Sequence, residues 1–265
     1  MAGTVIVVTS GKGGVGKTTT CANIGTGLAI QGRRVLLIDA DIGLRNLDVV
    51  MGLENRIVFD LVNVVEKTCR VKQALIKDKR FETLYLLPAA QTREKDAISQ
   101  ERMVEICEEL KQDFDYILID CPAGIEQGFK NAVAGADQAI LVTTPDLSAV
   151  RDADRIVGLL QAREHKIEPR LVVNRVRPAM VRKGEMMAVE DVNDILAVEL
   201  LGIVPDDETI ITSTNKGEPA VMDTYSKAGE AYRNIVARLE GESIPFMSLD
   251  YDLGFFGRLK KMIAK

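Results

Sequence analysis

The sequence lacks the residues that several classes of functional site require. Its four cysteines, Cys21, Cys69, Cys107 and Cys121, form no C-x-x-C pair, and its one histidine, His165, lies between two charged residues. This sparse pattern disfavours a histidine-based metal site, a histidine general base and a disulfide framework. It indicates reduced, mostly buried thiols in a cytoplasmic protein, and it leaves a cluster ligand shared by cysteines of two subunits as the alternative.

Long apolar runs and an excess of basic charge are also missing. No apolar stretch approaches the roughly 18 residues that a membrane-spanning helix needs, and no signal-peptide pattern precedes the first predicted strand. The net charge of −5 argues against bulk electrostatic attraction to nucleic acid. The 46% of hydrophobic and 28% of charged residues are typical of a soluble globular protein, and 265 residues are enough to bury a substantial core.

Short apolar, β-branched runs alternate along the chain with helix-length amphipathic segments. The runs that predict strands are residues 5–8, 35–38, 84–87, 116–119, 139–143, 171–173 and 200–204. The segments that predict helices include residues 18–30, 101–112, 128–134 and 150–163. This alternation predicts a single α/β domain over residues 1–240, with a mostly parallel, doubly wound sheet of about seven to eight strands flanked by helices. Ligands of such sheets gather at the carboxyl ends of the strands.

A glycine-rich loop between the first predicted strand and the first predicted helix carries the strongest signal in the chain. Residues 11–18 fit the phosphate-binding pattern G-x-x-x-x-G-K-[ST]. Glycines let backbone N–H groups turn inward around phosphate oxygens, and the N-terminus of the following helix favours anions. Lys17 brings positive charge to the β- and γ-phosphates, and the Thr18 hydroxyl is a Mg²⁺ ligand in such loops. We therefore predict nucleotide binding by Gly11, Lys12, Gly13, Gly14, Val15, Gly16, Lys17, Thr18 and Thr19.

A second lysine, Lys12, stands at the front of this loop. Lys17 already serves the phosphates, and a second ammonium group pointing the same way would be repelled by the first. Lys12 is better placed to reach across an interface to the nucleotide of a second subunit, where it would neutralise developing charge as an arginine finger does. A solvated lysine at a loop tip is the alternative.

Carboxylates follow two of the predicted strands. Asp39 and Asp41 come after the second strand, and Asp120 after the fourth, with Gly124 four residues further on. An acid at such a strand end reaches Mg²⁺ or orients an attacking water, and a glycine after it can contact a γ-phosphate and move when the phosphate leaves. The alternative is that these acids only cap the turns that follow. A phosphate loop in the same sheet favours the functional interpretation.

The composition changes near the C-terminus. Residues 241–252 have little periodicity and read as a linker, and residues 253–265 have helical amphipathicity. The predicted apolar face consists of Phe255, Phe256, Leu259, Met262 and Ile263, and the predicted basic face includes Arg258, Lys260 and Lys261. This pattern predicts a helix that lies in an anionic membrane surface, with a terminal helix docked on its own domain as the alternative. One short helix is a weak anchor, whereas two on a dimer bind far more tightly.

The segment Lys12–Thr18 resembles the deviant Walker A motif, which the extra lysine defines and which marks the ParA/MinD family of P-loop ATPases. Residues 39–48, 120–126 and 148–155 resemble the cell-division branch of this family, and the resemblance covers essentially the whole chain. It implies an ATPase that uses ATP and Mg²⁺, forms a homodimer when ATP is bound, and acts through Lys12, Lys17 and Asp41. By resemblance, Thr18, Asp39 and Asp120 support Mg²⁺; Asn174, Arg175, Pro205, Asp206 and Asp207 lie around adenine; and Asn46 and Gly124 belong to switch segments.

The same resemblance implies a membrane-cycling role in placing the cell-division septum. The protein would be cytoplasmic as a monomer or with ADP, and peripheral on the inner membrane with ATP. It would recruit the division inhibitor MinC and be stimulated by MinE at a face near residues 151–155, and it would bind no specific nucleic acid sequence. Three alternatives remain: a DNA-segregation ATPase, a flagellar-placement ATPase and an electron-transfer reductase similar to nitrogenase iron protein.

Overall fold

A computed structural model describes residues 2–91 and 98–247 of the chain. The strands are β1 (Thr4–Thr9), β2 (Val35–Asp39), β3 (Ile76–Lys77), β4 (Leu84–Leu87), β5 (Tyr116–Asp120), β6 (Gln138–Thr143), β7 (Pro169–Val176) and β8 (Glu199–Pro205). The helices are α1 (Lys17–Ile30), α2 (Leu47–Met51), α3 (Leu61–Val65), α4 (Val71–Ala74), α5 (Gln100–Leu110), α6 (Gln127–Ala134), α7 (Leu147–Gln161), α8 (Pro178–Arg182), α9 (Val189–Leu196), α10 (Thr209–Lys216) and α11 (Lys227–Leu239). Short 3-10 turns occupy Glu54–Arg56 and Ala220–Met222.

The strands form one eight-stranded sheet in the order β3-β4-β2-β5-β1-β6-β7-β8. All pairs among these strands are parallel except β3 with β4, which are antiparallel. The predicted α/β domain with a mostly parallel sheet is therefore confirmed. The sequence did not predict β3, because its two residues are too few to produce a periodic pattern.

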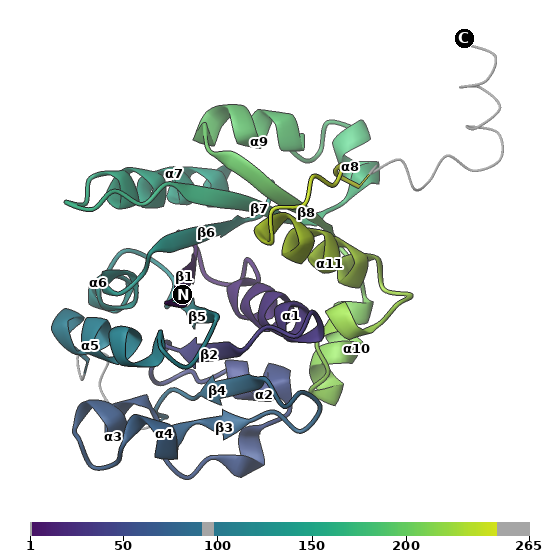
Figure 1. Ribbon diagram of the computed structural model, residues 1–265. Coiled ribbons are helices and arrows are strands. Elements are labelled where there is room, and N and C mark those ends of the chain that lie inside the picture. The colour runs from purple at the N-terminus through teal and green to yellow at the C-terminus, as the bar shows by residue number, and fades with distance from the viewer. Residues whose placement is uncertain (1, 92–97, 248–265) are drawn as a thin grey trace.

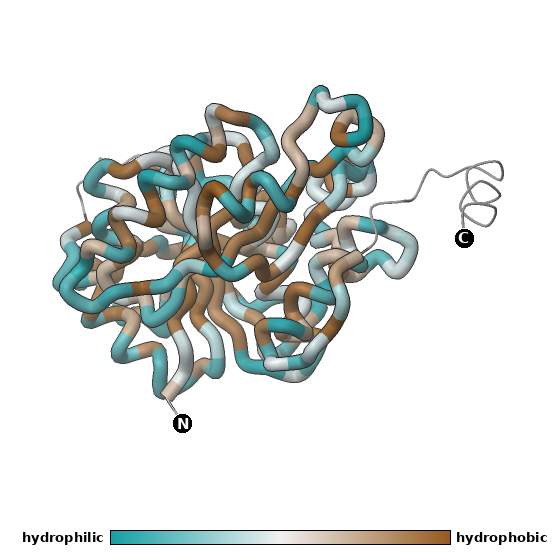
Figure 2. The backbone as a smooth tube through the Cα atoms, turned by 90° about the horizontal axis from the view of Figure 1, so that it is seen from above, coloured by the Kyte–Doolittle hydropathy of each residue, from teal (hydrophilic) through white to brown (hydrophobic). Residues whose placement is uncertain are grey.

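Helices cover both faces of this sheet (Figure 1). One apolar cluster joins the sheet to α3, α5, α6, α7 and α9, and a second joins its other face to α1, α2 and α11. Successive residues of β1 alternate between the two clusters, Val5 in the first and Ile6 in the second, and both are fully buried. Figure 2 shows the hydrophobic stretches of chain converging on these central strands. Burial on both faces explains why the strands are continuous apolar runs.

The strand order determines where the site forms. β5 lies between β2 and β1, so the loop after β1 and the ends of β2 and β5 are neighbours at one edge of the sheet. In the strand register Asp120 is opposite Val8 on one side and Asp39 on the other. The glycine-rich loop and two of the predicted acids are therefore brought together by the topology.

After α11 the chain turns back and is held against the domain by one arginine. Arg238 donates hydrogen bonds to the carbonyl oxygens of Leu201 at 3.0 Å, Ile244 at 3.1 Å and Pro245 at 3.0 Å. Its guanidinium carbon lies 4.3 Å from the centre of the Phe246 ring. The beginning of the predicted linker is thus attached to α11 and to the edge strand β8.

The predicted linker 241–252 is described as far as Met247. The predicted amphipathic helix at 253–265, with all of its predicted membrane-facing residues, lies outside the described residues. Within the described ranges, no helix combines the length and the apolar character needed to cross a bilayer.

Candidate nucleotide-binding site

The glycine-rich loop ends at the N-terminus of α1, a helix of 14 residues. Gly14 and Gly16 have φ angles of 78° and 100°, in the left-handed region that glycine adopts without strain. Gly16 is the residue before α1, and Lys17 begins the helix with its side chain largely buried. The loop therefore presents backbone donors and the positive end of the helix dipole to the same space, which is the arrangement that binds phosphate.

At two positions of this loop a neighbouring residue leaves no room for a side chain. A Cβ on Gly16 would lie 2.3 Å from Nδ2 of Asn174, and a Cβ on Gly11 would lie 2.2 Å from the backbone of Asp152 in α7. Asn174 Nδ2 donates to the Val15 carbonyl oxygen at 2.7 Å. Asn174, predicted from the resemblance to contact adenine, thus also braces the loop.

Asp39 and Asp120 sit side by side at the ends of β2 and β5, and both are almost fully buried. Asp39 accepts hydrogen bonds from the backbone N–H groups of Asp41 at 3.0 Å and Leu47 at 3.2 Å. Oδ1 of Asp120 is buried and has no hydrogen-bond partner within the described parts of the chain. Burial raises the pKa of both carboxyl groups, and the proximity of each to other carboxylates raises it further.

These residues fit a magnesium ion. The Thr18 hydroxyl is close enough to Asp120 to oppose the rise in the pKa of that carboxyl group, so a hydroxyl and an unsatisfied carboxylate oxygen stand together beside the phosphate loop. Among the described residues there is no cluster of three or more His, Cys, Asp and Glu side chains able to hold a metal. Mg²⁺ does not need one, since it is usually held by one or two carboxylates together with phosphates and water.

Lys12 is held within its own protomer. Its Nζ donates to the Ser148 hydroxyl at 2.7 Å and lies 3.7 Å from Oδ1 of Asp146. Asp146 also accepts hydrogen bonds from the Ser148 hydroxyl at 2.8 Å and from the Ala149 N–H at 3.0 Å, and so caps α7. No local sequence pattern indicates this contact, because 136 residues separate Lys12 from Ser148.

A pocket of about 420 Å³ adjoins the loop on the side of β7 and β8. It is lined by Gly16, Thr19, Asn174, Arg175, Arg177, Pro205, Asp206, Asp207, Glu208, Ile210, Ile211 and Tyr232. The five residues predicted to lie around adenine are all in this lining. Sequence reasoning missed Arg177, Glu208, the two isoleucines and Tyr232, which no motif marks.

Two aspartates of this pocket have different partners. Asp206 forms an ion pair with Arg177, with 2.6 Å between Oδ2 and Nε. Asp207 accepts hydrogen bonds from the backbone N–H groups of Thr209 and Ala228, each at 2.9 Å, and so joins the starts of α10 and α11. Asp206 is therefore at the surface of the pocket, whereas Asp207 is engaged in building it.

Of the two predicted switch residues, Gly124 contacts the residue before the loop and Asn46 lies at the start of α2. Gly124 has a φ of 91°, and its N–H donates to the Ser10 carbonyl oxygen at 3.3 Å. Asn46 is exposed and precedes α2. Its neighbour Arg45 has a φ of 43° and pairs with the buried Asp48 at 2.9 Å. Positive φ at a non-glycine residue is strained, which is common in segments that change conformation.

A larger cavity, of about 780 Å³, lies between α3, α4 and α5 and contains none of the predicted site residues. The site is therefore identified by the convergence of the loop, the acids and the smaller pocket, and not by cavity size.

Comparison with known proteins agrees with this geometry. Residues 6–220 match the family described as the CobQ/CobB/MinD/ParA nucleotide binding domain. The septum site-determining protein MinD of Bacillus subtilis is 58% identical over 264 residues, which cover 99% of this chain and 98% of that protein. The MinC:MinD cell division protein complex of Aquifex aeolicus has a TM-score of 0.87 at 50% identity and covers 92% of this chain and 98% of the other. MinD of Pyrococcus horikoshii, complexed with Mg-ADP, has a TM-score of 0.81 at 31% identity, with coverage of 89% and 96%.

These likenesses extend over nearly the whole length of each relative, and the range matched by the family spans the loop and the acids. The resemblance inferred from the sequence is confirmed. The chain belongs to the MinD branch of the CobQ/CobB/MinD/ParA family. Proteins of the MinD branch are P-loop ATPases that use a nucleotide with Mg²⁺ to place the division septum.

Proposed function

We propose that this protein binds ATP at the site described, forms a homodimer, attaches to the anionic inner membrane through its C-terminal helix, and recruits MinC. Hydrolysis stimulated by MinE then returns it to the cytoplasm. The observation that supports the proposal best is the unsatisfied, buried Asp120 carboxylate beside Thr18 and a phosphate loop that carries two lysines.

The chain's residues divide the work at the phosphates. The backbone of the loop and Lys17 bind the β- and γ-phosphates, while Thr18, Asp39 and Asp120 hold Mg²⁺. The ion, when bound, neutralises charge that develops on the phosphate oxygens. Asp41 stands at the end of β2, its N–H bonded to Asp39, and orients the attacking water. The base occupies the 420 Å³ pocket, which Asn174, Arg175, Pro205, Asp206 and Asp207 line.

Lys12 links hydrolysis to dimerisation. In the protomer its side chain is 46% exposed, and its ammonium group is held by Ser148 and Asp146, which are at the surface. Exposed contacts of this kind are worth about 0–1 kcal/mol, so they release easily. In the dimer Lys12 moves to the nucleotide of the partner subunit and stabilises the charge that develops there.

A solved relative supports one of the proposed partners. MinD of Aquifex aeolicus has been solved in complex with MinC, and we assign MinC as a partner of this chain as well. We assign MinE as the activator, with both partners at the outer face of α7 near Arg151 and Arg155. The basic and apolar residues at 253–265 supply the membrane contact, as their amphipathic pattern predicts.

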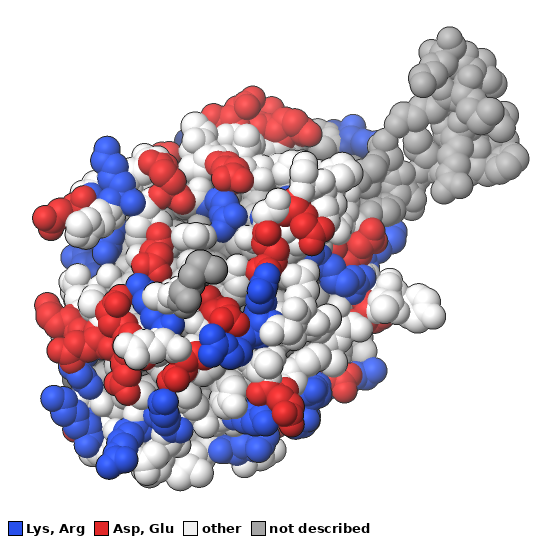
Figure 3. All heavy atoms as spheres, in the orientation of Figure 1, with Lys and Arg blue, Asp and Glu red and all other residues white. Residues whose placement is uncertain are grey.

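A DNA-segregation function is not favoured. Such a protein needs a basic surface for the phosphate backbone of DNA. On the face shown in Figure 3, Lys and Arg alternate with Asp and Glu and form no continuous basic area. The net charge of the chain is −5.

The test is the ATPase rate with anionic vesicles, with MinE, with both and with neither. We expect stimulation only when both are present, because MinE acts on the membrane-bound dimer. Phe256→Glu is expected to abolish vesicle binding and stimulation while leaving the basal rate unchanged. Stimulation by MinE without vesicles, or vesicle binding by Phe256→Glu, would contradict the membrane part of the proposal.

A further inference from the structure

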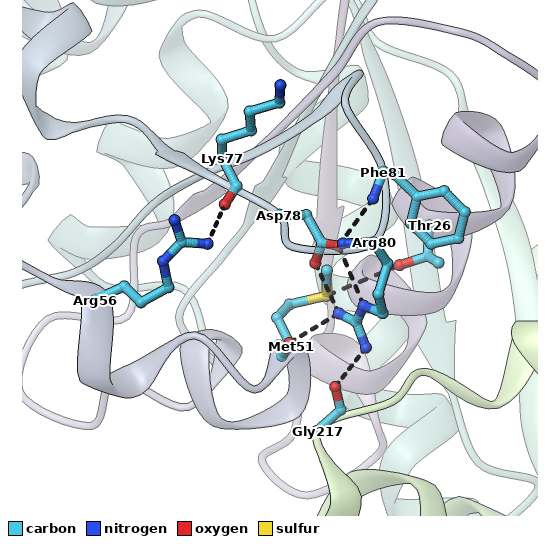
Figure 4. A network of polar contacts seen from close by, with 8 residues as sticks. All are labelled: Thr26, Met51, Arg56, Lys77, Asp78, Arg80, Phe81 and Gly217. Carbon is cyan, nitrogen blue, oxygen red and sulfur yellow. Dashed lines mark hydrogen bonds and ion pairs between the residues drawn. The ribbon is translucent and has the colours of Figure 1, made fainter.

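An arginine outside the nucleotide site joins the ends of two helices (Figure 4). Arg80 lies between β3 and β4, and its guanidinium donates to the carbonyl oxygens of Met51 at 2.8 Å and Gly217 at 2.6 Å. Met51 is the last residue of α2, and Gly217 directly follows α10. Helix C-termini carry partial negative charge and carbonyl groups without intrahelical donors, so one guanidinium satisfies both ends.

Asp78 fixes the orientation of that guanidinium. Nε and Nη2 of Arg80 donate to the two carboxylate oxygens of Asp78 at 3.1 and 2.7 Å. The backbone N–H groups of Arg80 and Phe81 donate to the same carboxylate at 2.7 and 3.2 Å. The Asp78 side chain is fully buried, and that of Arg80 is 15% exposed. A bidentate pair shielded from water has a defined geometry, so both helices are attached to a fixed point.

The two helix ends also touch each other. Gly52 and Gly217 both have a φ of 65°, which ends each helix in the left-handed conformation. A Cβ on Gly217 would lie 2.4 Å from the Cα of Gly52. The backbones therefore meet directly, and a side chain at either position would separate the helices.

The opposite ends of the same helices lie at the nucleotide site. α2 begins at Leu47, whose N–H donates to the carboxylate of Asp39 at 3.2 Å. α10 begins beside the base pocket, and its residues Ile210 and Ile211 line that pocket. Each helix therefore spans the distance from the Arg80 junction to one part of the site.

The two helices are not anchored equally. Four of the five residues of α2 are buried, whereas none of the eight residues of α10 is. Apolar burial holds α2 in place, whereas α10 packs against α2 and brings the partly buried Ile210 to the core, so the contacts at its ends contribute a larger share of what fixes its position. Those contacts are the Asp207 hydrogen bond to Thr209 at the start and the Arg80 hydrogen bond to Gly217 at the finish.

We propose that Arg80 is a positioning residue for base recognition: it fixes the place of α10, and thereby the wall of the base pocket, without touching the nucleotide. The inference rests on the proposed placement of the ATP base in that pocket. Without Arg80, α10 loosens, while α2 and the Asp39 carboxylate stay in place. The base side of the site is affected, and the phosphate side is spared.

The test compares binding of ATP with binding of inorganic tripolyphosphate, which has phosphates but no base. Arg80→Ala is expected to weaken ATP binding about tenfold, and tripolyphosphate binding by less than about twofold. Gly217→Ala disturbs the same junction from the side of α10 and is expected to give the same split. Arg56→Ala is the matched control, because Arg56 donates to the Lys77 carbonyl oxygen at 2.9 Å and contacts neither helix end in Figure 4.

An equal loss of affinity for both ligands would overturn the inference, as would unchanged ATP binding by a folded Arg80→Ala protein. Where Arg80→Ala does not fold, Arg80→Lys keeps the charge but not the fork of donors, and a split of about threefold is expected. If the unmodified protein binds tripolyphosphate as tightly as ATP, the proposed base pocket itself is wrong and the inference falls with it.

Discussion

Two positively charged side chains of this protein hold neighbouring segments in opposite ways. Arg80 is 15% exposed and is paired with a fully buried carboxylate, and it joins α2 to α10. Lys12 is 46% exposed and is paired with Asp146, whose side chain is 50% exposed. Both are ion pairs between a basic side chain and an aspartate, but water reaches the Lys12–Asp146 pair and is largely excluded from the Arg80–Asp78 pair.

The difference separates a permanent contact from a releasable one. In water an ion pair is worth about 0–1 kcal/mol, because solvation of the separated charges replaces most of the attraction. Removing one partner of a buried pair costs about 3–5 kcal/mol, because the other charge is left without compensation. The frame of the site is therefore fixed at Arg80, and the lysine that acts in the proposed dimer is free to leave its own protomer.

Removal of Asp78 is the variant with the largest expected effect, and it tests whether burial makes the Arg80–Asp78 pair the stronger of the two. Asp78→Ala leaves the guanidinium of Arg80 largely buried without a counter-charge, and we expect it to lower the free energy of unfolding by about 3–5 kcal/mol. Urea denaturation followed by circular dichroism measures the loss. Asp113→Ala is the control: it breaks the exposed pair with Lys72 at 2.8 Å and is expected to cost about 0–1 kcal/mol. Equal losses in the two variants would mean that burial does not separate the clusters.

A second variant tests a buried carboxyl group, one of whose oxygens has no hydrogen-bond partner within the described residues. Asp120→Asn is expected to increase the free energy of unfolding by about 1–3 kcal/mol at neutral pH without nucleotide, while it weakens magnesium-dependent ATP binding. The reason is that burial raises the pKa of Asp120, so ionising it costs more in the folded chain than in the unfolded one.

The pH dependence gives this second prediction its sign. A raised folded pKa means that the folded chain binds the proton more tightly than the unfolded chain does, so this carboxyl makes stability fall as pH rises. The gain from Asp120→Asn should therefore be absent below the unfolded pKa of about 3.9 and complete above the raised one. Denaturation curves at several pH values measure it, and a gain that stays constant with pH would contradict the assignment.

The smallest expected effect is at Lys12. Ser148→Ala removes one hydrogen bond to an exposed ammonium group, and we expect the free energy of unfolding to change by less than about 1 kcal/mol. Asp146→Ala also removes the cap of α7 and should cost about 1 kcal/mol more. Thermal unfolding of the two variants side by side separates these contributions. If Ser148→Ala lowered the free energy of unfolding as much as Asp78→Ala, the Lys12 contacts would not be weaker than the Arg80 contacts.

The sequence was most informative where structure is local. The glycine loop, the strand before it and the helix after it are contiguous, so their motif and periodicity predict both the fold and the phosphate site. The acids at the ends of β2 and β5 could be placed near that loop because parallel strands end at the same edge of a sheet.

Contacts between distant residues were not predictable from the sequence. Asn174 bonds to Val15 across 159 positions, and Arg80 bonds to Gly217 across 137. Neither has a local pattern, because each depends on how whole elements pack against one another. Tyr232 is fully buried and lies in no motif, yet it lines the base pocket.

Arg238 determines how much of the predicted linker is available to separate the domain from the predicted C-terminal helix. The predicted linker has 12 residues, from 241 to 252, but the segment up to Phe246 is bound to the domain and Met247 packs beside its core. For the predicted linker, a start at residue 248 instead of residue 241 would reduce the root-mean-square span expected of a flexible chain from roughly 19 Å to roughly 12 Å. The local concentration of a tethered group falls with about the −3/2 power of chain length, so the shortening raises it about fourfold. In the proposed dimer, Arg238 therefore affects how readily the C-terminal helix of the second subunit binds the bilayer after that of the first subunit has bound.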